Sequence, residues 1–282
     1  MAPELAPRAA AVHEVRTGRV DEIAGELLSD VEGELLVALG GGRVIDTAKA
    51  LAAARDPGER PLVAAIPTTL SAAEMTTVHR RAAGADGSLP GVRPAIVIND
   101  PALSASQPEA QLAASAANAL GHAIEGPATV RSSPVPALAG HEAVRLIGAA
   151  YRSSGGHDRE ALALGALLSG YAIDACGYGL HHVLAQTLAR FGGGISHAQA
   201  NAVLLAHTLA ALQSRGASGA GAALELARDL ARRAGATRLR ELGVDEQVLD
   251  ECAAAAAQRP DLDLTPPRPD RDEIRALYGA AL

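Results

Sequence analysis

The sequence predicts an α/β domain with a short parallel sheet, followed by a domain built only of helices. Within the first hundred residues, short apolar runs alternate with a glycine turn and a helical pattern, as in a parallel sheet. After about Ser104 nearly every segment has a helical pattern, interrupted by short stretches rich in Gly, Ser and Pro. We therefore expect two domains, residues 1–104 and residues 105–282.

The elements of the first domain follow from its apolar runs. Residues 20–28 and about 43–55 have the pattern of helices. The runs 34–39, 62–66 and 94–99 are short, rich in Leu, Val, Ile and Ala, and bounded by glycine or proline, which is typical of buried strands. The order strand, glycine turn, helix, strand indicates that the sheet is parallel.

Composition excludes several classes of protein. The 282 residues are 48% hydrophobic with one Phe and no Trp, which predicts a folded chain with an aliphatic core. A net charge of −7 without a basic stripe argues against nucleic-acid binding. We see no signal-peptide core and no apolar run of membrane-spanning length. Cys176 and Cys252 alone make no disulfide framework, so we expect a cytoplasmic protein.

Three glycines, Gly40, Gly41 and Gly42, separate the first strand from the helix that follows. Without a Cβ, glycine lets backbone N–H groups approach an anion closely, and a helix N-terminus adds its positive dipole end. The turn therefore suits a phosphate group. Glycine turns of this kind also occur for steric reasons alone, so both interpretations stay open.

The second strand leads into a loop rich in hydroxyl groups. Thr68, Thr69 and Ser71 follow the carboxyl end of the strand, which is where α/β sheets place their ligands. Ser71 with Glu74 three residues on also has the pattern of a helix start. A ligand-binding role and a capping role are compatible.

Three predicted helices carry polar side chains that could meet in one pocket. Asn118 and His122 lie four residues apart, as do His182 and Gln186, so each pair shares a helix face. His197 opens another helix after a glycine-rich turn. Together the histidines could bind a metal, or donate protons and hydrogen bonds to a substrate oxygen. Singly, each could be a packing or surface residue, the role we expect of His207.

Six segments occur in the order found in the iron-containing alcohol dehydrogenase superfamily, which this sequence resembles over most of residues 34–282. They are GGGRVIDTAKA, IPTTLSAAEMT, IVINDPAL, NALGHAIEG, GLHHVLAQTL and SHAQANAVLLAH. The C-terminal segment resembles that of the maleylacetate reductases. The resemblance implies a dehydroquinate synthase-like fold in which an N-terminal dinucleotide-binding domain and a helical domain enclose the site.

The resemblance also assigns roles to the residues singled out above. It implies that the three glycines hold the pyrophosphate of NAD(P), with Thr68, Thr69 and Ser71 beside the same cofactor. It aligns four residues with the metal-ligand positions of the family: Asn118, His122, His182 and His197. Metal-dependent members have Asp where this chain has Asn118, and the maleylacetate reductases, which resemble this chain there, are understood to work without metal.

Other departures from the family pattern concern cofactor binding and the residues that could transfer a proton. Gln186 stands where a further histidine is usual, and one extra residue precedes His197. Only 39 residues precede the glycine turn, so the sequence resembles an N-terminally shortened member whose contact to the cofactor ribose is missing.

Two functions therefore compete. The first is a metal-independent NAD(P)H-dependent reductase of a small carbonyl or enone, in which Arg80, Arg81 or Arg93 could hold a substrate carboxylate. The second is a non-redox isomerase, dehydratase or cyclase that uses the same histidines without nicotinamide. A third hypothesis is that the chain is a non-catalytic relative of these enzymes. We expect a small-molecule substrate and a homodimer formed through an exposed strand edge.

Overall fold

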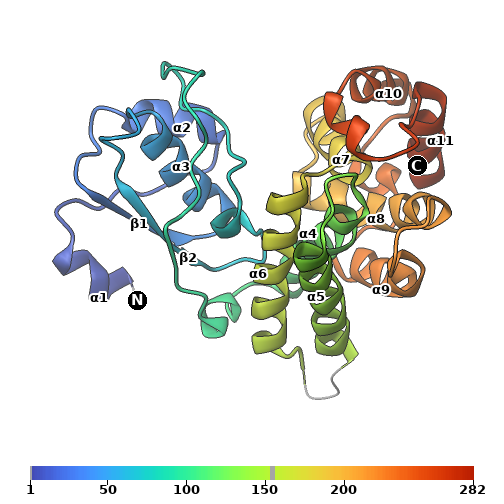
Figure 1. The fold of residues 1–282 in the computed structure, drawn as a ribbon, viewed down its shortest axis with the longest axis horizontal. Helices are drawn as coiled ribbons and strands as arrows, with labels where there is room; N and C mark the ends of the chain where they lie inside the picture. The colour runs from blue at the N-terminus through green and yellow to red at the C-terminus, as the bar shows by residue number, and fades with distance from the viewer. Residues whose placement is uncertain (1, 153–155) are drawn as a thin grey trace.

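The computed structural model describes residues 2–152 and 156–282, which form a sheet-containing part and a helical part side by side (Figure 1). All three strands precede residue 98, and the long helices begin at residue 109. The elements of the first part are α1 (Ala2–Leu5), η1 (Ala6–Arg8), α2 (Val20–Leu27), β1 (Leu35–Gly40), α3 (Gly42–Ala53), β2 (Leu62–Pro67), η2 (Ala73–Met75), β3 (Ile96–Val97) and η3 (Pro101–Ser104).

The sheet is parallel, with strand order β1-β2-β3, as the alternation of elements predicts. β3 is shorter than the predicted run 94–99, because only Ile96 and Val97 pair fully with β2. Hydrogen bonds from the Ala95 amide to the Val63 carbonyl and from the Ile98 amide to the Ala65 carbonyl extend the contact by one residue at each end. Pro94 lacks an N–H and cannot extend the ladder further.

One face of the sheet packs on α3. Ala38 of β1 and Val63 and Ala65 of β2 form a buried cluster with Ile45 and Ala52 of α3. On the far side of α3, Ala50 and Leu51 pack with α2. The small side chains of β1, β2 and α3 let the helix lie close to the strands, which fixes its N-terminus at the end of β1.

The helical part is arranged around α4 (Glu109–Ala128), which is buried along most of its length. Alanine and glycine allow close approach: a Cβ on Gly126 would lie 3.0 Å from the carbonyl oxygen of Ala172. The elements that follow are α5 (Pro134–Arg152), α6 (Arg159–Cys176), α7 (Leu180–Phe191), α8 (His197–Ser214), α9 (Ala220–Arg233), η4 (Leu239–Leu242), η5 (Glu246–Val248), α10 (Leu249–Ala257), η6 (Pro260–Leu264) and α11 (Arg271–Ala281).

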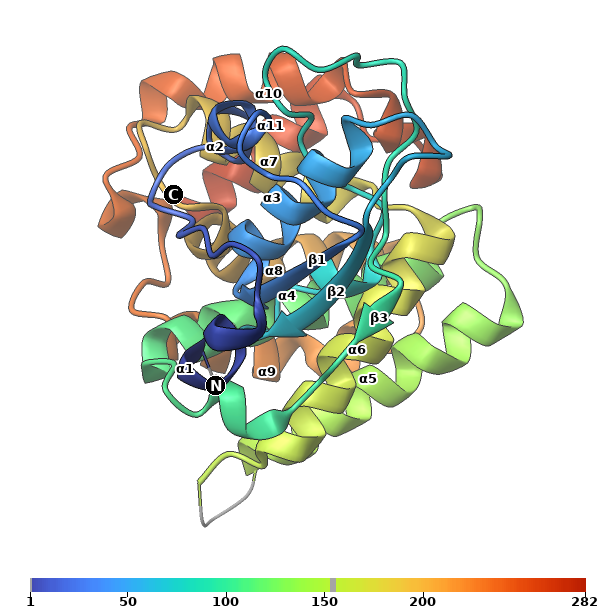
Figure 2. The ribbon, with the colours of Figure 1, turned by 90° about the vertical axis from the view of Figure 1, so that its left-hand side faces the viewer.

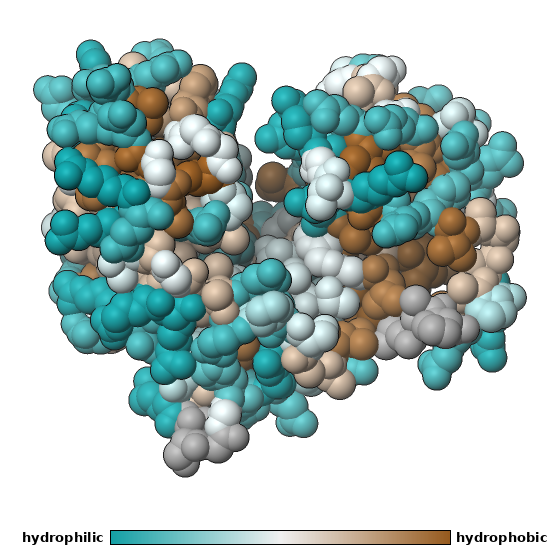
Figure 3. All heavy atoms as spheres, turned by 180° about the vertical axis from the view of Figure 1, so that it is seen from behind, coloured by the Kyte–Doolittle hydropathy of each residue, from teal (hydrophilic) through white to brown (hydrophobic). Residues whose placement is uncertain are grey.

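The loop after β2 joins the two parts. The amide of Leu70 donates to Ser115 Oγ of α4 over 2.9 Å. The amide and hydroxyl of Thr77 both donate to Asp174 Oδ1 of α6, over 2.7 and 2.9 Å, and Arg93 pairs with the other oxygen. The surface is hollowed between the two parts (Figure 3). The carboxyl end of the sheet therefore faces the helical part directly.

Among the described helices, none is by itself long and apolar enough to cross a membrane. α6 and α7 taken together are long and apolar enough, but the pair is bent by 97° at the break between the two helices. The two cysteines, Cys176 and Cys252, are both buried as free thiols.

Candidate functional site

The structure brings the three predicted histidines together. The rings of His122 on α4 and His182 on α7 are stacked, with centroids 4.5 Å apart and planes at 14°. The ring of His197, at the start of α8, lies 6.4 Å from that of His182. His122 and His182 are buried, whereas His197 is exposed to solvent. The cluster therefore extends from the interior to the surface.

Glu125, which the sequence analysis did not single out, orients the cluster. Its carboxylate accepts the ring N–H of His182 Nδ1 over 2.5 Å, and the backbone amides of His181 and His182 over 2.5 and 3.3 Å. Only 1% of Glu125 is exposed. With its Nδ1 proton bound in this way, His182 presents an unprotonated Nε2, which is buried and makes no hydrogen bond among the described residues.

Burial keeps the inner histidines neutral. It lowers the pKa of His182 to about 3, and that of the neighbouring His181 to about 3. Burial, together with the His182 and His197 rings, holds the pKa of His122 well below its usual range. Burial raises the pKa of Glu125, while the amides that it accepts favour its ionised form. The inner rings are therefore hydrogen-bonding groups at neutral pH, not cations.

Asn118 connects the histidine helix to the loop after β2. Its Nδ2 group donates to the carbonyl oxygen of Ser71 over 3.4 Å, and its Oδ1 accepts from Asn201 Nδ2 over 2.9 Å. Asn201, one turn after His197 on α8, is completely buried. Both ends of the Asn118 amide are thus engaged within the protein.

Gln186 is one turn beyond His182 on α7 and contacts a cation that the sequence analysis did not consider. Its Oε1 accepts from Arg259 Nη2 over 3.1 Å, and Arg259 also donates to the hydroxyl of Tyr178 over 3.3 Å. The Tyr178 ring lies 6.1 Å from that of His182. Arg259 is half-buried and pairs with Asp261 at 2.8 Å. Gln186 therefore links the cluster to a guanidinium group.

The glycine turn and the hydroxyl loop lie against each other at the carboxyl end of the sheet. A Cβ on Gly41 would meet Thr69 Cγ2 at 3.0 Å, and one on Gly42 would meet Ser71 Oγ at 2.8 Å. α3 begins at Gly42 without a side-chain cap. The Thr68 amide donates to the Gly40 carbonyl, which joins the two loops. These residues fit a pyrophosphate, because bare backbone at an uncapped helix N-terminus is available to an anion.

The predicted helix start at Ser71 is only partly correct. The segment forms a short 3-10 turn over Ala73–Met75, whose cap position is Ala72 in the left-handed region, and Ser71 Oγ accepts only from the Ala73 amide at 3.4 Å. Lys49 of α3 stabilises this turn through hydrogen bonds to its carbonyl groups. Its buried ammonium donates to the carbonyls of Ala73 and Val78 over 2.9 Å each, and binds Asp46 at 2.8 Å.

Around the histidines, the oxygen atoms of Glu125 and Asn118 already accept hydrogen bonds from other protein groups. Across residues 2–152 and 156–282, no three or more His, Cys, Asp or Glu side chains are placed to hold a metal ion. The carboxylate nearest the rings, Glu125, is bound to the ring and backbone N–H groups described above, and Asn118 Oδ1 accepts from Asn201. Oxygen ligands that would strengthen a histidine site are therefore occupied by protein donors.

The arginines considered for a substrate carboxylate make other contacts. Arg93 binds Asp174, Arg81 donates to the carbonyl of Pro90, and Arg80 lies 3.9 Å from Asp21. The structure gives none of the three a contact with the histidine cluster among the described residues. The arginine that does reach the cluster, through Gln186 and Tyr178, is Arg259.

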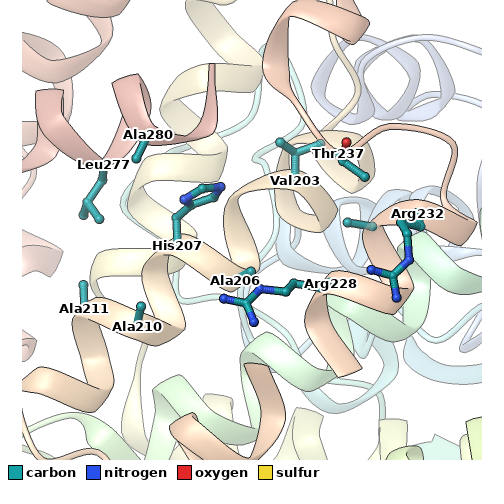
Figure 4. A pocket seen from close by; sticks show the side chains of 11 residues that line it. Val203, Ala206, His207, Ala210, Ala211, Arg228, Arg232, Thr237, Leu277 and Ala280 are labelled. Carbon is teal, nitrogen blue, oxygen red and sulfur yellow. The ribbon is translucent and has the colours of Figure 1, made fainter. Parts of the chain in front are cut away.

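His207 lies away from this site, between α8, α9 and α11 (Figure 4). It is half-buried and lines a largely apolar cavity of about 520 Å³, with Arg228 and Arg232 on α9 and Leu277 on α11. Burial and the nearby Arg228 lower the pKa of His207. His207, which we expected to pack between helices, thus lies at the edge of a cavity and not in a filled core.

Comparison with known proteins assigns both parts of the chain to one family. The model of the iron-containing alcohol dehydrogenases matches residues 8–101, and that of the C-terminal part of the Fe-containing alcohol dehydrogenase family matches residues 112–218. A maleylacetate reductase of Burkholderia cepacia is 32% identical over 277 residues, which cover 90% of this chain and 75% of the relative.

Solved structures agree with the sequence comparison. The crystal structure of maleylacetate reductase from Agrobacterium tumefaciens is 30% identical, with a TM-score of 0.75 over 92% of this chain and 78% of that one. An iron-containing alcohol dehydrogenase from Corynebacterium glutamicum is 27% identical, with a TM-score of 0.82 over 100% of this chain and 84% of the other. This chain therefore belongs to the iron-containing alcohol dehydrogenase family and is an NAD(P)H-dependent reductase of that family.

Proposed function

We propose that the chain reduces a small carbonyl or enone substrate that carries a carboxylate, using NAD(P)H and no metal. The observation that carries this proposal is the hydrogen bond from Asn118 to the Ser71 carbonyl. It joins the helix that bears His122 to the loop that lies against the glycine turn. The residues that would hold the cofactor and the helix that bears a histidine of the substrate site are thereby joined.

The glycine turn supports the cofactor end of the proposal. Gly41 and Gly42 pack so closely against Thr69 and Ser71 that a side chain on either glycine would displace the hydroxyl loop. The hydroxyl of Thr69 is buried and has no partner among the described residues, so a cofactor oxygen could bond to it. The pyrophosphate would lie on the N-terminus of α3, and the bound cofactor would supply a hydride.

The histidines support the substrate end. His122 and His182 are neutral, so neither places a cation beside the cofactor. The ring N–H of His122 could donate to a substrate carbonyl, whereas the unprotonated Nε2 of His182 could accept a hydrogen bond or a proton at the site. His197 is exposed and can exchange protons with water. A bound NAD(P)H would supply a hydride, with its two electrons, to the substrate carbon and leave as NAD(P)⁺, while His197 would relay a proton from water to the substrate oxygen or adjacent carbon.

The absence of a metal requirement is proposed from the donor set. Asn118 is neutral, and both ends of its amide are bound to Ser71 and Asn201. Glu125 holds His182 instead of serving as a ligand. Three neutral rings without a carboxylate make a weak site for iron. Maleylacetate, the substrate in the names of the relatives, is the first candidate substrate, and Arg259 is the cation that we propose for its carboxylate.

The test is the loss of NADPH or NADH absorbance on addition of maleylacetate, measured with enzyme treated with a chelator. We expect turnover that the chelator does not diminish. His182→Gln should lower kcat by roughly 100-fold, the size of the loss expected when one preorganised hydrogen-bonding group is removed from a buried site. His13→Gln, at an exposed position, is the matched control and should leave kcat unchanged.

Two outcomes would overturn the proposal. Activity that disappears with the chelator and returns with iron or zinc would show that the reaction needs a metal. No turnover of several carbonyl and enone acids, with no binding of either nucleotide, would leave the non-redox acid–base enzyme as the function to test.

A further inference from the structure

A cavity in the helical part lies apart from the histidine cluster. It is the space of about 520 Å³ beside His207, enclosed by α8, α9 and α11 (Figure 4). Figure 2 looks from the side of the sheet, and these three helices lie behind the sheet. On α8, His207 follows His197 by ten residues, which corresponds to about 15 Å along the helix. The cavity is therefore separate from the proposed active site.

The wall of the cavity is aliphatic. Side chains from all three helices contribute to it, among them Val203, Ala206, Ala210, Ala231, Leu277 and Ala280. Alanine occupies most of these positions, so the helices leave space that no side chain fills. A volume of this size is typical of sites for small molecules. Because the described lining residues include no Phe, Tyr or Trp, the wall suits a flexible alkyl chain better than a flat ring.

The polar side chains of the cavity favour an anion. Arg228 and Arg232 lie four residues apart and share one face of α9, and His207 lines the same cavity from α8 (Figure 4). Burial lowers the pKa of His207, and the nearby charge of Arg228 lowers it further. The described lining residues include no Asp or Glu. The cavity thus has a positive potential that no lining side chain neutralises.

The two arginines are available to a ligand. Arg228 pairs with Glu225, and Arg232 pairs with Asp229, in both cases within α9. The arginine side chains are 54% and 58% exposed. Ion pairs as exposed as these contribute little to stability, so a carboxylate in the cavity can compete for the guanidinium groups. A guanidinium group can hold a carboxylate through two parallel hydrogen bonds.

We propose that this cavity binds a medium-chain aliphatic carboxylate. The alkyl chain lies against the alanines of α8 and Leu277 of α11, and Arg228 and Arg232 bind the carboxylate. The site does not depend on the proposed reaction, because none of the residues assigned to the cofactor or the substrate lines the cavity.

Calorimetric titration of the purified chain with octanoate tests the proposal. We expect one octanoate per chain, with a submillimolar dissociation constant. Octanol has the same alkyl chain without the charge, and benzoate has the carboxylate without the alkyl chain. Each should bind more weakly than octanoate by roughly 10-fold or more, because each lacks one of the two interactions.

Substitution of the arginines tests the carboxylate contact. Arg228→Met and Arg232→Met should each raise the dissociation constant for octanoate by roughly 10-fold, because each removes a charged hydrogen-bond donor. The matched control is Arg145→Met on α5. Arg145 is similarly exposed and pairs with Glu142 three residues away, as Arg228 pairs with Glu225, so its loss should leave the affinity unchanged.

Two further measurements locate the ligand. Ala210→Phe, at an exposed position of the wall, should abolish octanoate binding by filling the cavity, and circular dichroism verifies that the variant is folded. In NMR spectra the ring resonances of His207, assigned with His207→Gln, should shift when octanoate is added. The resonances of His13, in the exposed N-terminal segment, should not shift.

The proposal fails if octanoate does not bind the wild-type chain, or if octanol binds as tightly as octanoate. It also fails if the affinity is unchanged in both arginine variants. Binding that persists in Ala210→Phe and shifts the rings of His122 or His182 instead of His207 would assign octanoate to the histidine cluster, and would equally contradict a site in this cavity.

Discussion

Glu125 is the residue on which the orientation of the histidine cluster depends. It is fully buried and accepts the His182 ring proton and two backbone amides. We expect Glu125→Gln to lower kcat by roughly 100-fold, because an amide cannot hold the imidazole in one tautomer as a carboxylate does. The dissociation constant for NADPH should not change, since Glu125 contacts no residue of the glycine turn.

The control for Glu125→Gln is Glu26→Gln, which changes an exposed glutamate on α2. Steady-state kinetics with calorimetric NADPH binding separates the effects. Equal losses in nucleotide binding and turnover would indicate that Glu125 supports only the fold, and would contradict its role in positioning His182.

The buried neutral histidines predict that acid destabilises the fold. Burial lowers the pKa of His181 and His182 to about 3, below the ordinary value of 6.5. Between about pH 6.5 and 3 the unfolded chain binds protons that the folded chain does not. The free energy of unfolding should therefore fall as the pH falls, by up to about 1.4 kcal/mol per pH unit for each histidine.

Urea unfolding at several pH values within this window measures the slope. His181→Gln should reduce the slope by about the contribution of one histidine. His13→Gln, in the exposed N-terminal segment, should leave it unchanged. An unfolding free energy that does not depend on pH below neutrality would contradict the neutral, buried state of the two rings.

At the scale of elements, the turn from β1 into α3 determines cofactor binding. A Cβ on Gly42 would lie 2.8 Å from Ser71 Oγ, so it would push the hydroxyl loop away from the helix N-terminus that is proposed to bind the pyrophosphate. We expect Gly42→Ala to raise the dissociation constant for NADPH at least 10-fold, about 1.4 kcal/mol, while the fold persists. Gly58→Ala is the control, because its Cβ would meet no heavy atom within 4 Å.

Fluorescence titration with NADPH compares the two variants. Unchanged affinity in Gly42→Ala would show that the cofactor does not use the N-terminus of α3. The reductase would then need a different nucleotide site.

Lys49 joins α3 to the loop after β2 and is the only lysine of the chain. It is completely buried, and its ammonium binds Asp46 and the carbonyls of Ala73 and Val78. Lys49→Met should lower the free energy of unfolding by about 3 kcal/mol, because it leaves buried acceptors without a donor. Arg55→Met, at an exposed position just after α3, should cost less than about 1 kcal/mol.

Urea unfolding monitored by circular dichroism gives both values. Amine-reactive labelling gives an independent check, since Lys49 should react only when the chain unfolds. Rapid labelling of Lys49 in the native protein would contradict its burial.

The elements were predictable from local patterns to different degrees. The strand–glycine–helix order and the three helices that carry Asn118, His122, His182 and His197 follow from apolar periodicity, which is a local property. β3 is shorter than its apolar run because pairing needs a partner strand and free N–H groups, and Pro94 removes one. Glu125 had a local signal, because it is the one carboxylate of its helix beyond Glu109 and follows His122 by three residues. Arg259 had none, because its contact with Gln186 spans 73 residues.

At the scale of the whole molecule, the sheet and the helices contribute complementary halves of one site. The loop after β2 contacts α4 through Leu70 and Ser71, and α6 through Thr77. A hollow separates the two parts on the surface (Figure 3). The sequence predicted both halves, but their meeting depends on packing between segments far apart in the chain. The central claim is that these two halves form one catalytic site.

The most direct test of that claim is a calorimetric titration of the chelator-treated protein with NADPH and NADH, with metal content measured on the same sample. The account predicts micromolar binding of one of the nucleotides, at one per chain, in protein that contains no iron or zinc. Absence of binding of both nucleotides at millimolar concentration, or binding that requires added metal, would contradict it.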